Sequence, residues 1–222
     1  MDKYALIAAG GKGIRMKAQG PKPFLELAGK PLLVHVFETF QKYDPNIRFV
    51  LVLPESLHTR WAEVCRKFSI YGAHVVAAAG PTRFHSVKSG LKHIPDDALV
   101  AIHDGARPLV ALDLIARVFH IASKFGNAIP VIEPADSLRI TEHAQSSPLP
   151  RERVRMVQTP QCFRAASLKR AYNKNYHPSF TDDATVLESE GERIYLADGC
   201  RRNLKITTAT DLEMAAGLFY RP

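Results

Sequence analysis

Apolar runs and polar breaks alternate regularly along the chain. Unbroken apolar runs predict strands that are buried on both faces of a sheet. Such strands are expected in the segments 4–9, 48–54, 73–80, 98–108 and 127–134, some of which continue into a loop. Between them, apolar residues recur at the three- and four-residue spacing of amphipathic helices, over residues 31–40, 61–68, 83–94 and 112–125. Strands that alternate with helices predict an α/β fold with a doubly wound, mostly parallel sheet and right-handed crossovers.

The pattern changes between Ser137 and Gln158. Residues 137–143 and 153–158 alternate between apolar and polar, and a polar segment with prolines separates them. Two alternating segments about a turn predict a protruding β-hairpin arm. The regular alternation argues against the alternative, a disordered insertion. Because an isolated hairpin is marginally stable in water, we expect the arm, residues 137–158, to pack on a second subunit.

The remaining residues predict shorter elements. Helices are expected near residues 164–172 and 182–190, and a strand at 193–197. Lys205 is expected at a strand end, after the glycine-bearing turn at residues 198–199. A C-terminal helix is expected from Thr208 onward, because Thr208 and Asp211 have the spacing of a capping box.

Length and composition favour a single domain. The chain has 222 residues, of which 46% are apolar, enough for one sizeable core over residues 1–222. No apolar stretch approaches the roughly 18 residues of a membrane span, and the N-terminus lacks a secretory leader pattern. We therefore expect a cytoplasmic protein without a membrane partner. Its three cysteines match no metal-binding spacing and are expected to be reduced: Cys65, Cys162 and Cys200.

The net charge of +8 suits either a nucleic acid or a small anionic substrate. The positive residues are scattered, and the densest groups are residues 151–155 and the pair Arg201 and Arg202. A lysine-rich tail and an aromatic RNA-binding signature are both missing from the sequence. The charge therefore favours an anionic small molecule over a nucleic acid.

A glycine-rich segment, "AGGKGIRM", directly follows the first predicted strand. Doubly wound sheets bind ligands beyond the carboxyl ends of their strands, and glycines let backbone N–H groups approach an anion closely. The segment matches neither the Walker loop nor the dinucleotide fingerprint, because Met16 occupies the position of the third glycine. Arg15, within this segment, and Lys22, after it, supply the positive charge that binding of a triphosphate requires.

Five segments in order resemble one enzyme family. The glycine segment followed by Pro21–Lys22 resembles nucleotidyltransferases that join a nucleoside triphosphate to a sugar phosphate. With "HDGARP" at 103–108, "TPQCF" at 159–163, "FTDDA" at 180–184 and "NLKIT" at 203–207, the chain resembles the 2-C-methyl-D-erythritol 4-phosphate cytidylyltransferases of the non-mevalonate isoprenoid pathway. The resemblance covers essentially the whole chain and implies a Rossmann-like fold.

The resemblance also implies a reaction and its catalytic groups. CTP and methylerythritol 4-phosphate would give CDP-methylerythritol and pyrophosphate. Arg15 and Lys22 would face the triphosphate, and Lys205 would lie near the attacked α-phosphate. Asp104, a carboxylate at the end of the fourth predicted strand, is the expected ligand of Mg²⁺. We expect the neighbouring His103 to be packed in the loop rather than to carry acid–base chemistry.

Within this family, CTP is recognised by loop backbone and a serine. The matching positions for CTP binding in this sequence are Ala9, Gly10, Gly11, Gly13, Gly80, Ser86 and Asp104. Arg83 matches the family's arginine, and we expect it to be structural, in an ion pair that holds the loop. The chain departs from the usual residues of the family at Gly10, Pro23 and Pro81.

The sugar phosphate is expected to have its own binding residues. The positions that match the family are Arg107, Ser137, Arg151 and Thr159. Thr159 could instead simply shape the turn before its proline. In the family the arm crosses to a partner subunit, which implies a homodimer whose sites are completed by arm exchange.

Two alternatives remain open from the sequence. The same fold and CTP site would serve a ribitol 5-phosphate cytidylyltransferase. A non-catalytic basic module that binds RNA is the alternative from another class. A guanylyltransferase of the molybdopterin type would require a Gly-x-Asp-Lys step, which "QGPKPF" does not provide.

Overall fold

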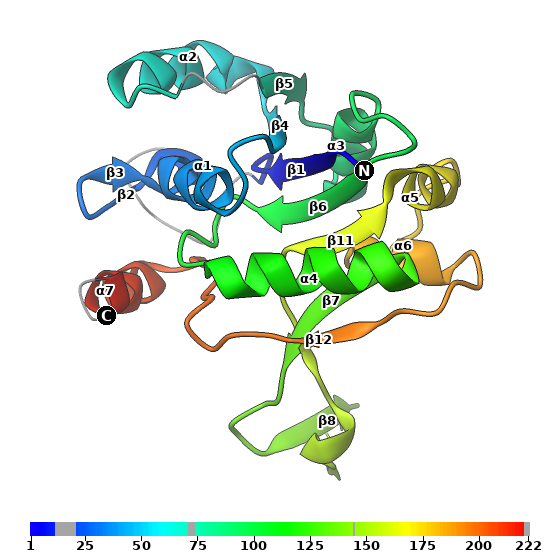
Figure 1. Cartoon of the computed structure of the whole chain (residues 1–222). Helices are drawn as coiled ribbons and strands as arrows, with labels where there is room; N and C mark the ends of the chain where they lie inside the picture. The colour runs from blue at the N-terminus through cyan, green and yellow to red at the C-terminus, as the bar shows by residue number, and fades with distance from the viewer. Residues whose placement is uncertain (12–20, 71–73, 144, 220–222) are drawn as a thin grey trace.

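The computed structural model describes residues 1–11, 21–70, 74–143 and 145–219. Its central sheet has the order β10-β7-β11-β6-β1-β4-β5, and β12 also pairs with β7 (Figure 1). These strands are β1 (Lys3–Ala8), β4 (Arg48–Leu53), β5 (His74–Ala78), β6 (Leu99–Asp104), β7 (Asn127–Ile132), β10 (Met156–Val157), β11 (Gln161–Arg164) and β12 (Leu196–Asp198). Neighbours β5, β4, β1 and β6 are parallel, whereas β11 runs antiparallel between β6 and β7.

Helices cover both faces of this sheet, which is why its strands are apolar without a break. On one face lie α1 (Leu32–Tyr43), α2 (His58–Lys67) and α4 (Leu112–Phe125), and on the other α3 (Arg83–Leu91), α5 (Ala165–Tyr172) and α6 (Asp183–Glu188). Successive β1 residues alternate between the two cores: Ala5 and Ile7 join the first, and Leu6 joins the second. The doubly wound, mostly parallel prediction is confirmed.

The C-terminal helix α7 (Ala209–Phe219) starts as predicted. The N–H of Thr208 donates to Asp211 Oδ2 at 2.8 Å, and the N–H of Asp211 donates to Thr208 Oγ1 at 3.2 Å. Beneath the helix, a small core joins Leu27, Ile206 and Ala215. Leu27 belongs to a short ribbon of β2 (Glu26–Leu27) and β3 (Lys30–Pro31), so α7 covers the segment that follows Lys22. Single turns complete the order: η1 (Lys22–Phe24), η2 (Glu55–Leu57) and η3 (Arg151–Arg153).

A hairpin arm is present, but its second strand differs from the prediction. Strand β8 (Leu138–Glu142) pairs antiparallel with β9 (Gln145–Leu149), not with residues 153–158. Met156 and Val157 instead form β10 on the edge of the central sheet, beside β7. The alternation of residues 153–158 indicated two unlike faces but could not identify the partner strand. Figure 1 shows the hairpin projecting away from the layered body.

Lys205 does not lie at a strand end, contrary to the prediction. The segment 203–207 has no ladder partner and is held by single contacts, such as the hydrogen bond from Ile206 N–H to the Ala106 carbonyl at 2.8 Å. Within the described ranges, the helices are too short or too polar to cross a membrane.

Candidate active site

A cleft of about 440 Å³ opens beyond the carboxyl ends of β1 and β6. It gathers eight of the residues that the sequence singled out: Ala9, Gly10, Gly11, Lys22, Gly80, Ser86, Asp104 and Lys205. Segments that are far apart in the sequence therefore meet at the edge of the sheet where a doubly wound fold binds its ligand. Arg15 and Gly13 lie outside the described residues.

Two glycines allow close packing around the loop before α3, Gly10 from the first loop and Gly80 from within the loop itself. A Cβ added to Gly10 would lie 2.8 Å from the Ala79 Cβ and 3.1 Å from the Ser86 Oγ. A Cβ on Gly80 would lie 2.4 Å from the Cβ of His85. Such distances leave no space for a side chain at either position unless neighbouring atoms shift, so the backbone packs closely at both glycines.

Ser86 fixes the loop from within. Its hydroxyl accepts the Gly80 N–H at 3.1 Å and donates to the Thr82 carbonyl at 2.9 Å. Thr82 in turn caps α3, because its Oγ1 accepts the His85 N–H at 3.4 Å. The loop backbone is thus held in place before a ligand arrives.

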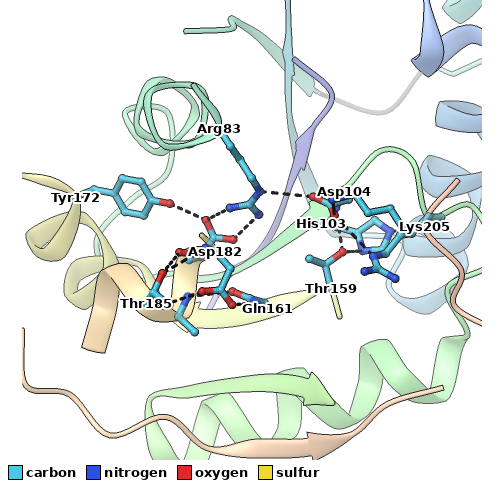
Figure 2. A network of polar contacts seen from close by, with 12 residues as sticks. Arg83, His103, Asp104, Thr159, Gln161, Tyr172, Asp182, Thr185 and Lys205 are labelled. Atoms are coloured by element: carbon cyan, nitrogen blue, oxygen red, sulfur yellow. Dashed lines mark hydrogen bonds and ion pairs between the residues drawn. The ribbon is translucent and has the colours of Figure 1, made fainter. Parts of the chain in front are cut away.

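Asp104 is the electrostatic centre of the cleft (Figure 2). Lys205 Nζ lies 2.7 Å from its Oδ2, Arg83 Nε lies 3.6 Å from its Oδ1, and Arg107 Nε lies 3.7 Å from its Oδ2. Burial by itself raises the pKa of the Asp104 carboxyl, but the charges of Arg83, Lys205 and Arg107 outweigh it and hold this pKa well below its usual range. Asp104 is therefore ionised across the physiological range.

His103 is packed, as expected. Its ring is fully buried, and burial lowers the pKa of His103 to about 4. The Arg107 carbonyl can only accept a hydrogen bond, so His103 Nε2 is protonated and donates to it at 3.1 Å. His103 Nδ1 then accepts from the hydroxyl of Thr159 at 3.2 Å. The same hydroxyl oxygen accepts the Asp104 N–H at 3.1 Å, so this buried chain orients the Asp104 backbone.

The four predicted sugar-phosphate residues divide into two pairs. Arg107 and Thr159 lie beside Asp104, and an Arg107 guanidinium nitrogen donates to the Asn203 carbonyl at 2.6 Å. Burial lowers the pKa of Arg107, although Asp104 opposes that shift. Ser137 and Arg151 are exposed at the arm and do not line the cleft of their own chain.

Sequence reasoning missed three residues that stabilise the site. Asn203 donates to the Thr159 carbonyl at 2.7 Å and so fixes the segment that carries Lys205. Asp183 accepts two hydrogen bonds from Arg83, in the ion pair expected for that arginine, and Tyr172 donates to Asp183. Asn203 and Asp183 lie in the segments "NLKIT" and "FTDDA", but only the fold shows what each of them contacts.

The donor set of the cleft suits a magnesium ion that is carried mainly by phosphates. Among the described residues that line the cleft, Asp104 supplies the sole carboxyl group. The described ranges also contain no cluster of three or more His, Cys, Asp or Glu side chains that could hold a metal. Mg²⁺ in nucleotide sites commonly takes one or two carboxylates and completes its octahedron with phosphate oxygens and water, so these residues fit it.

Comparisons with known proteins agree on one family. A family model described as IspD, 2-C-methyl-D-erythritol 4-phosphate cytidylyltransferase, matches residues 4–221. A protein of that name from Bacteroides thetaiotaomicron is 43% identical over 98% of this chain and 100% of its own length, and one from Bacteroides fragilis is 44% identical with the same coverage. The crystal structure of the Thermus thermophilus protein of that name is 32% identical, covers 98% of both chains and has a TM-score of 0.78.

Proposed function

Because this chain belongs to the 2-C-methyl-D-erythritol 4-phosphate cytidylyltransferase family, it transfers CMP from CTP to that substrate in isoprenoid biosynthesis, and we propose that the cleft around Asp104 performs the transfer. The observation that carries the proposal is the convergence of the glycine loop, Lys22, Gly80, Asp104 and Lys205 on one cleft.

The transfer is a substitution at the α-phosphorus of CTP. A phosphate oxygen of methylerythritol 4-phosphate forms the new P–O bond, and the bond to the β-phosphate oxygen breaks, so that pyrophosphate leaves. The attacking phosphate is already ionised and needs little help from a base. Positioning and charge neutralisation should therefore supply most of the rate acceleration, and the neutral, buried His103 is not required as a base.

We assign the positive residues to the phosphates. Lys22 lines the cleft beside the glycine loop and would contact the β- and γ-phosphates together with Arg15. Lys205, which forms an ion pair with Asp104, would neutralise charge at the α-phosphate. Both ammonium groups supply compact positive charge that can follow the phosphate oxygens through the transition state.

The end of the cleft lined by Gly10, Gly80 and Ser86 would hold the cytosine. Gly10 and Gly80 leave no room for a side chain, so backbone groups can approach the edge of a small base, and a purine would meet the loop wall. Ser86, whose hydroxyl fixes the loop, would act there with the neighbouring backbone.

We propose that the reaction requires Mg²⁺, held by Asp104 and the phosphates of CTP. The ion would neutralise charge on the triphosphate and favour departure of pyrophosphate. A chelator should abolish activity and added Mg²⁺ should restore it, whereas Asp104→Asn should need a much higher Mg²⁺ concentration for half-maximal rate. Full activity of Asp104→Asn at low Mg²⁺ would remove Asp104 from the metal site.

We also propose a homodimer in which the arm completes the neighbouring site. The β8–β9 hairpin pairs only with itself among the described strands, and Ile140 and Met156 are each more than 40% exposed at the arm and its base. A second arm related by a two-fold axis would cover these apolar side chains. Arg151, which does not line the cleft of its own chain, would then bind the sugar phosphate in the partner's site.

Subunit complementation tests this arrangement. An Arg151→Ala subunit is mixed with a Lys22→Ala subunit, each nearly inactive alone. If sites are shared, a heterodimer has one doubly defective site and one intact site, so activity rises toward half of the wild-type value. Lys22→Ala mixed with Lys205→Ala is the control, because both changes affect the chain's own cleft and leave no intact site. Verified heterodimers of the first pair without recovery would contradict the shared site.

The three cysteines at positions 65, 162 and 200 are free thiols, which supports a reducing compartment, and we place the enzyme in the cytoplasm.

A further inference from the structure

A carboxylate outside the cleft lies at the centre of a buried polar cluster. Asp183 has no exposed surface. Its Oδ1 accepts hydrogen bonds from an Arg83 nitrogen at 2.8 Å and from the Tyr172 hydroxyl at 2.6 Å, and its Oδ2 accepts from the second Arg83 nitrogen at 2.6 Å. The guanidinium therefore binds this carboxylate with both of its terminal nitrogens, the geometry that fixes an arginine most firmly.

The position of Asp183 is itself fixed by its neighbours. Asp182 caps α6 through a reciprocal pair of contacts with Thr185. The side chain of Gln161, on β11, donates to Asp182 at 2.8 Å and accepts the N–H of Ala184 at 3.0 Å. Figure 2 shows Gln161, Asp182 and Thr185 on one side of Arg83, and Asp104 and Lys205 on the other. Asp183 is thus held by the central sheet.

Arg83 connects this cluster to the cleft. It is the first residue of α3, directly after the loop of Gly80 and Thr82, and it lines the cleft. Because Asp183 engages both terminal nitrogens, the edge of the guanidinium that remains for the cleft is Nε, which lies 3.6 Å from Asp104 Oδ1. One side chain thereby links the loop proposed to bind cytosine with the carboxylate proposed to bind the metal.

The chemistry of the pair argues against stability as its main contribution. A buried ion pair loses hydration on both partners, and apolar replacements of similar size are often neutral or stabilising. The Tyr172 hydroxyl adds another buried polar group to the cluster, and burial with the nearby Asp183 charge raises its pKa, so it stays a donor. Unlike an apolar cluster, this polar cluster holds the Arg83 guanidinium in one orientation at the edge of the cleft.

We propose that Asp183 and Tyr172 are positioning residues for nucleotide binding, acting through Arg83 to hold the loop of residues 80–86 at a fixed distance from Asp104. The inference rests on the proposed assignment of this cleft to CTP. Without the clamp, Arg83 would turn its terminal nitrogens to Asp104, and the loop would lose its anchor to the sheet. CTP affinity would fall even where the fold is retained.

The test measures the Kd for CTP by calorimetry, with and without Mg²⁺, and the unfolding temperature of each free variant. Asp183→Asn and Arg83→Lys, which keep size or charge but lose the two-nitrogen contact, should weaken CTP binding by about tenfold or more. Tyr172→Phe, which removes one hydrogen bond, should weaken it by about threefold. The triple variant Arg83→Met/Tyr172→Phe/Asp183→Leu, which also removes the hydroxyl that would lose its acceptor, should unfold near the wild-type temperature and still bind CTP poorly.

A matched control separates positioning from stability. Asn127 is buried and makes two hydrogen bonds to residues 193 and 195, in the segment that leads into β12, and it does not line the cleft. Asn127→Ala should lower the unfolding temperature and leave the Kd for CTP unchanged.

The outcomes are distinct. The positioning role of Asp183 and Tyr172 would be overturned if Tyr172→Phe and every Asp183 or Arg83 variant that folds had the wild-type Kd for CTP. It would also be overturned if Asn127→Ala lost as much CTP affinity as those variants. A wild-type protein that does not bind CTP would instead contradict the assignment of the cleft.

Discussion

The ammonium nitrogen of Lys205 lies 2.7 Å from Oδ2 of Asp104. The two residues come from different segments, the extended stretch before α7 and the carboxyl end of β6. Arg83 and Arg107 approach the same carboxylate, so one negative group is surrounded by three positive ones. This arrangement leaves a cleft with excess positive charge, which suits a triphosphate and a sugar phosphate that meet there.

Removal of the Lys205 charge should slow turnover. We expect Lys205→Met to lower kcat by on the order of 10²-fold, the scale seen when a fixed charge donor is lost from a transition state. The side chain is 44% exposed, but it pairs with the buried Asp104, so the unfolding temperature should fall somewhat and kcat is measured well below it. Lys174→Met is the matched control, because it breaks an exposed ion pair, with Glu190, outside the cleft. Near wild-type kcat in Lys205→Met would refute its role.

Loss of the Thr159 hydroxyl should destabilise the protein. In Thr159→Val, the Asp104 N–H and His103 Nδ1 lose their buried partner, which should lower the free energy of unfolding by about 1–3 kcal/mol. Thr159→Ser keeps the hydroxyl and should stay close to wild type. Urea denaturation of the three proteins measures the difference, and equal stability of the valine and serine variants would show that the hydroxyl contributes nothing.

A methyl group on Gly80 should weaken nucleotide binding. The added Cβ would lie 2.4 Å from the Cβ of His85 and 3.2 Å from the Ser86 N, so the loop must move. We expect Gly80→Ala to raise the KM for CTP by roughly tenfold, equal to about 1.4 kcal/mol of binding free energy. The control Gly217→Ala adds a methyl group to α7 where no atom lies within 4 Å, and it should leave KM unchanged. A wild-type KM in both variants would exclude this loop from the CTP site.

The Cys65 thiol should react slowly in the folded protein. Burial raises the pKa of Cys65 to about 11. At pH 8 its thiolate fraction, and hence its alkylation rate, should be on the order of 100-fold below that of an unfolded thiol. Between about pH 9 and 11 the Cys65 thiol stays protonated in the folded state but loses its proton in the unfolded state. This thiol therefore lowers the free energy of unfolding as the pH rises through that range. Peptide mapping after iodoacetamide treatment, with and without urea, measures the rates; equal rates would contradict the shift.

The sequence predicted most of the fold because its signals are local. The unbroken apolar run of β1 follows from burial on both faces, where Ala5 and Leu6 enter opposite cores. The capping box of Thr208 and Asp211 is also local, and the structure confirms it. The strand partner of β8 was missed, because alternation in residues 153–158 reports exposure and carries no information on pairing.

The site was predicted less completely, for a related reason. Motifs identified Asp104, Lys22 and Lys205, which line one cleft. The contact between Arg83 and Asp183 joins residues far apart in sequence, and neither residue type alone indicates the other. Such pairs become visible only when the sheet brings α3 and α6 together.

The central claim is that this cleft joins CTP to methylerythritol 4-phosphate, and pyrophosphate release tests it most directly. Each of CTP, UTP, ATP and GTP is supplied with Mg²⁺ and with methylerythritol 4-phosphate or ribitol 5-phosphate as acceptor. We expect rapid pyrophosphate release from CTP with methylerythritol 4-phosphate. The kcat/KM should be at least about 10²-fold lower with a purine nucleotide or with ribitol 5-phosphate, because a wrong substrate leaves buried polar groups unpaired or collides with the loop of residues 80–86. Faster release with ribitol 5-phosphate, or equal use of CTP and ATP, would contradict the account.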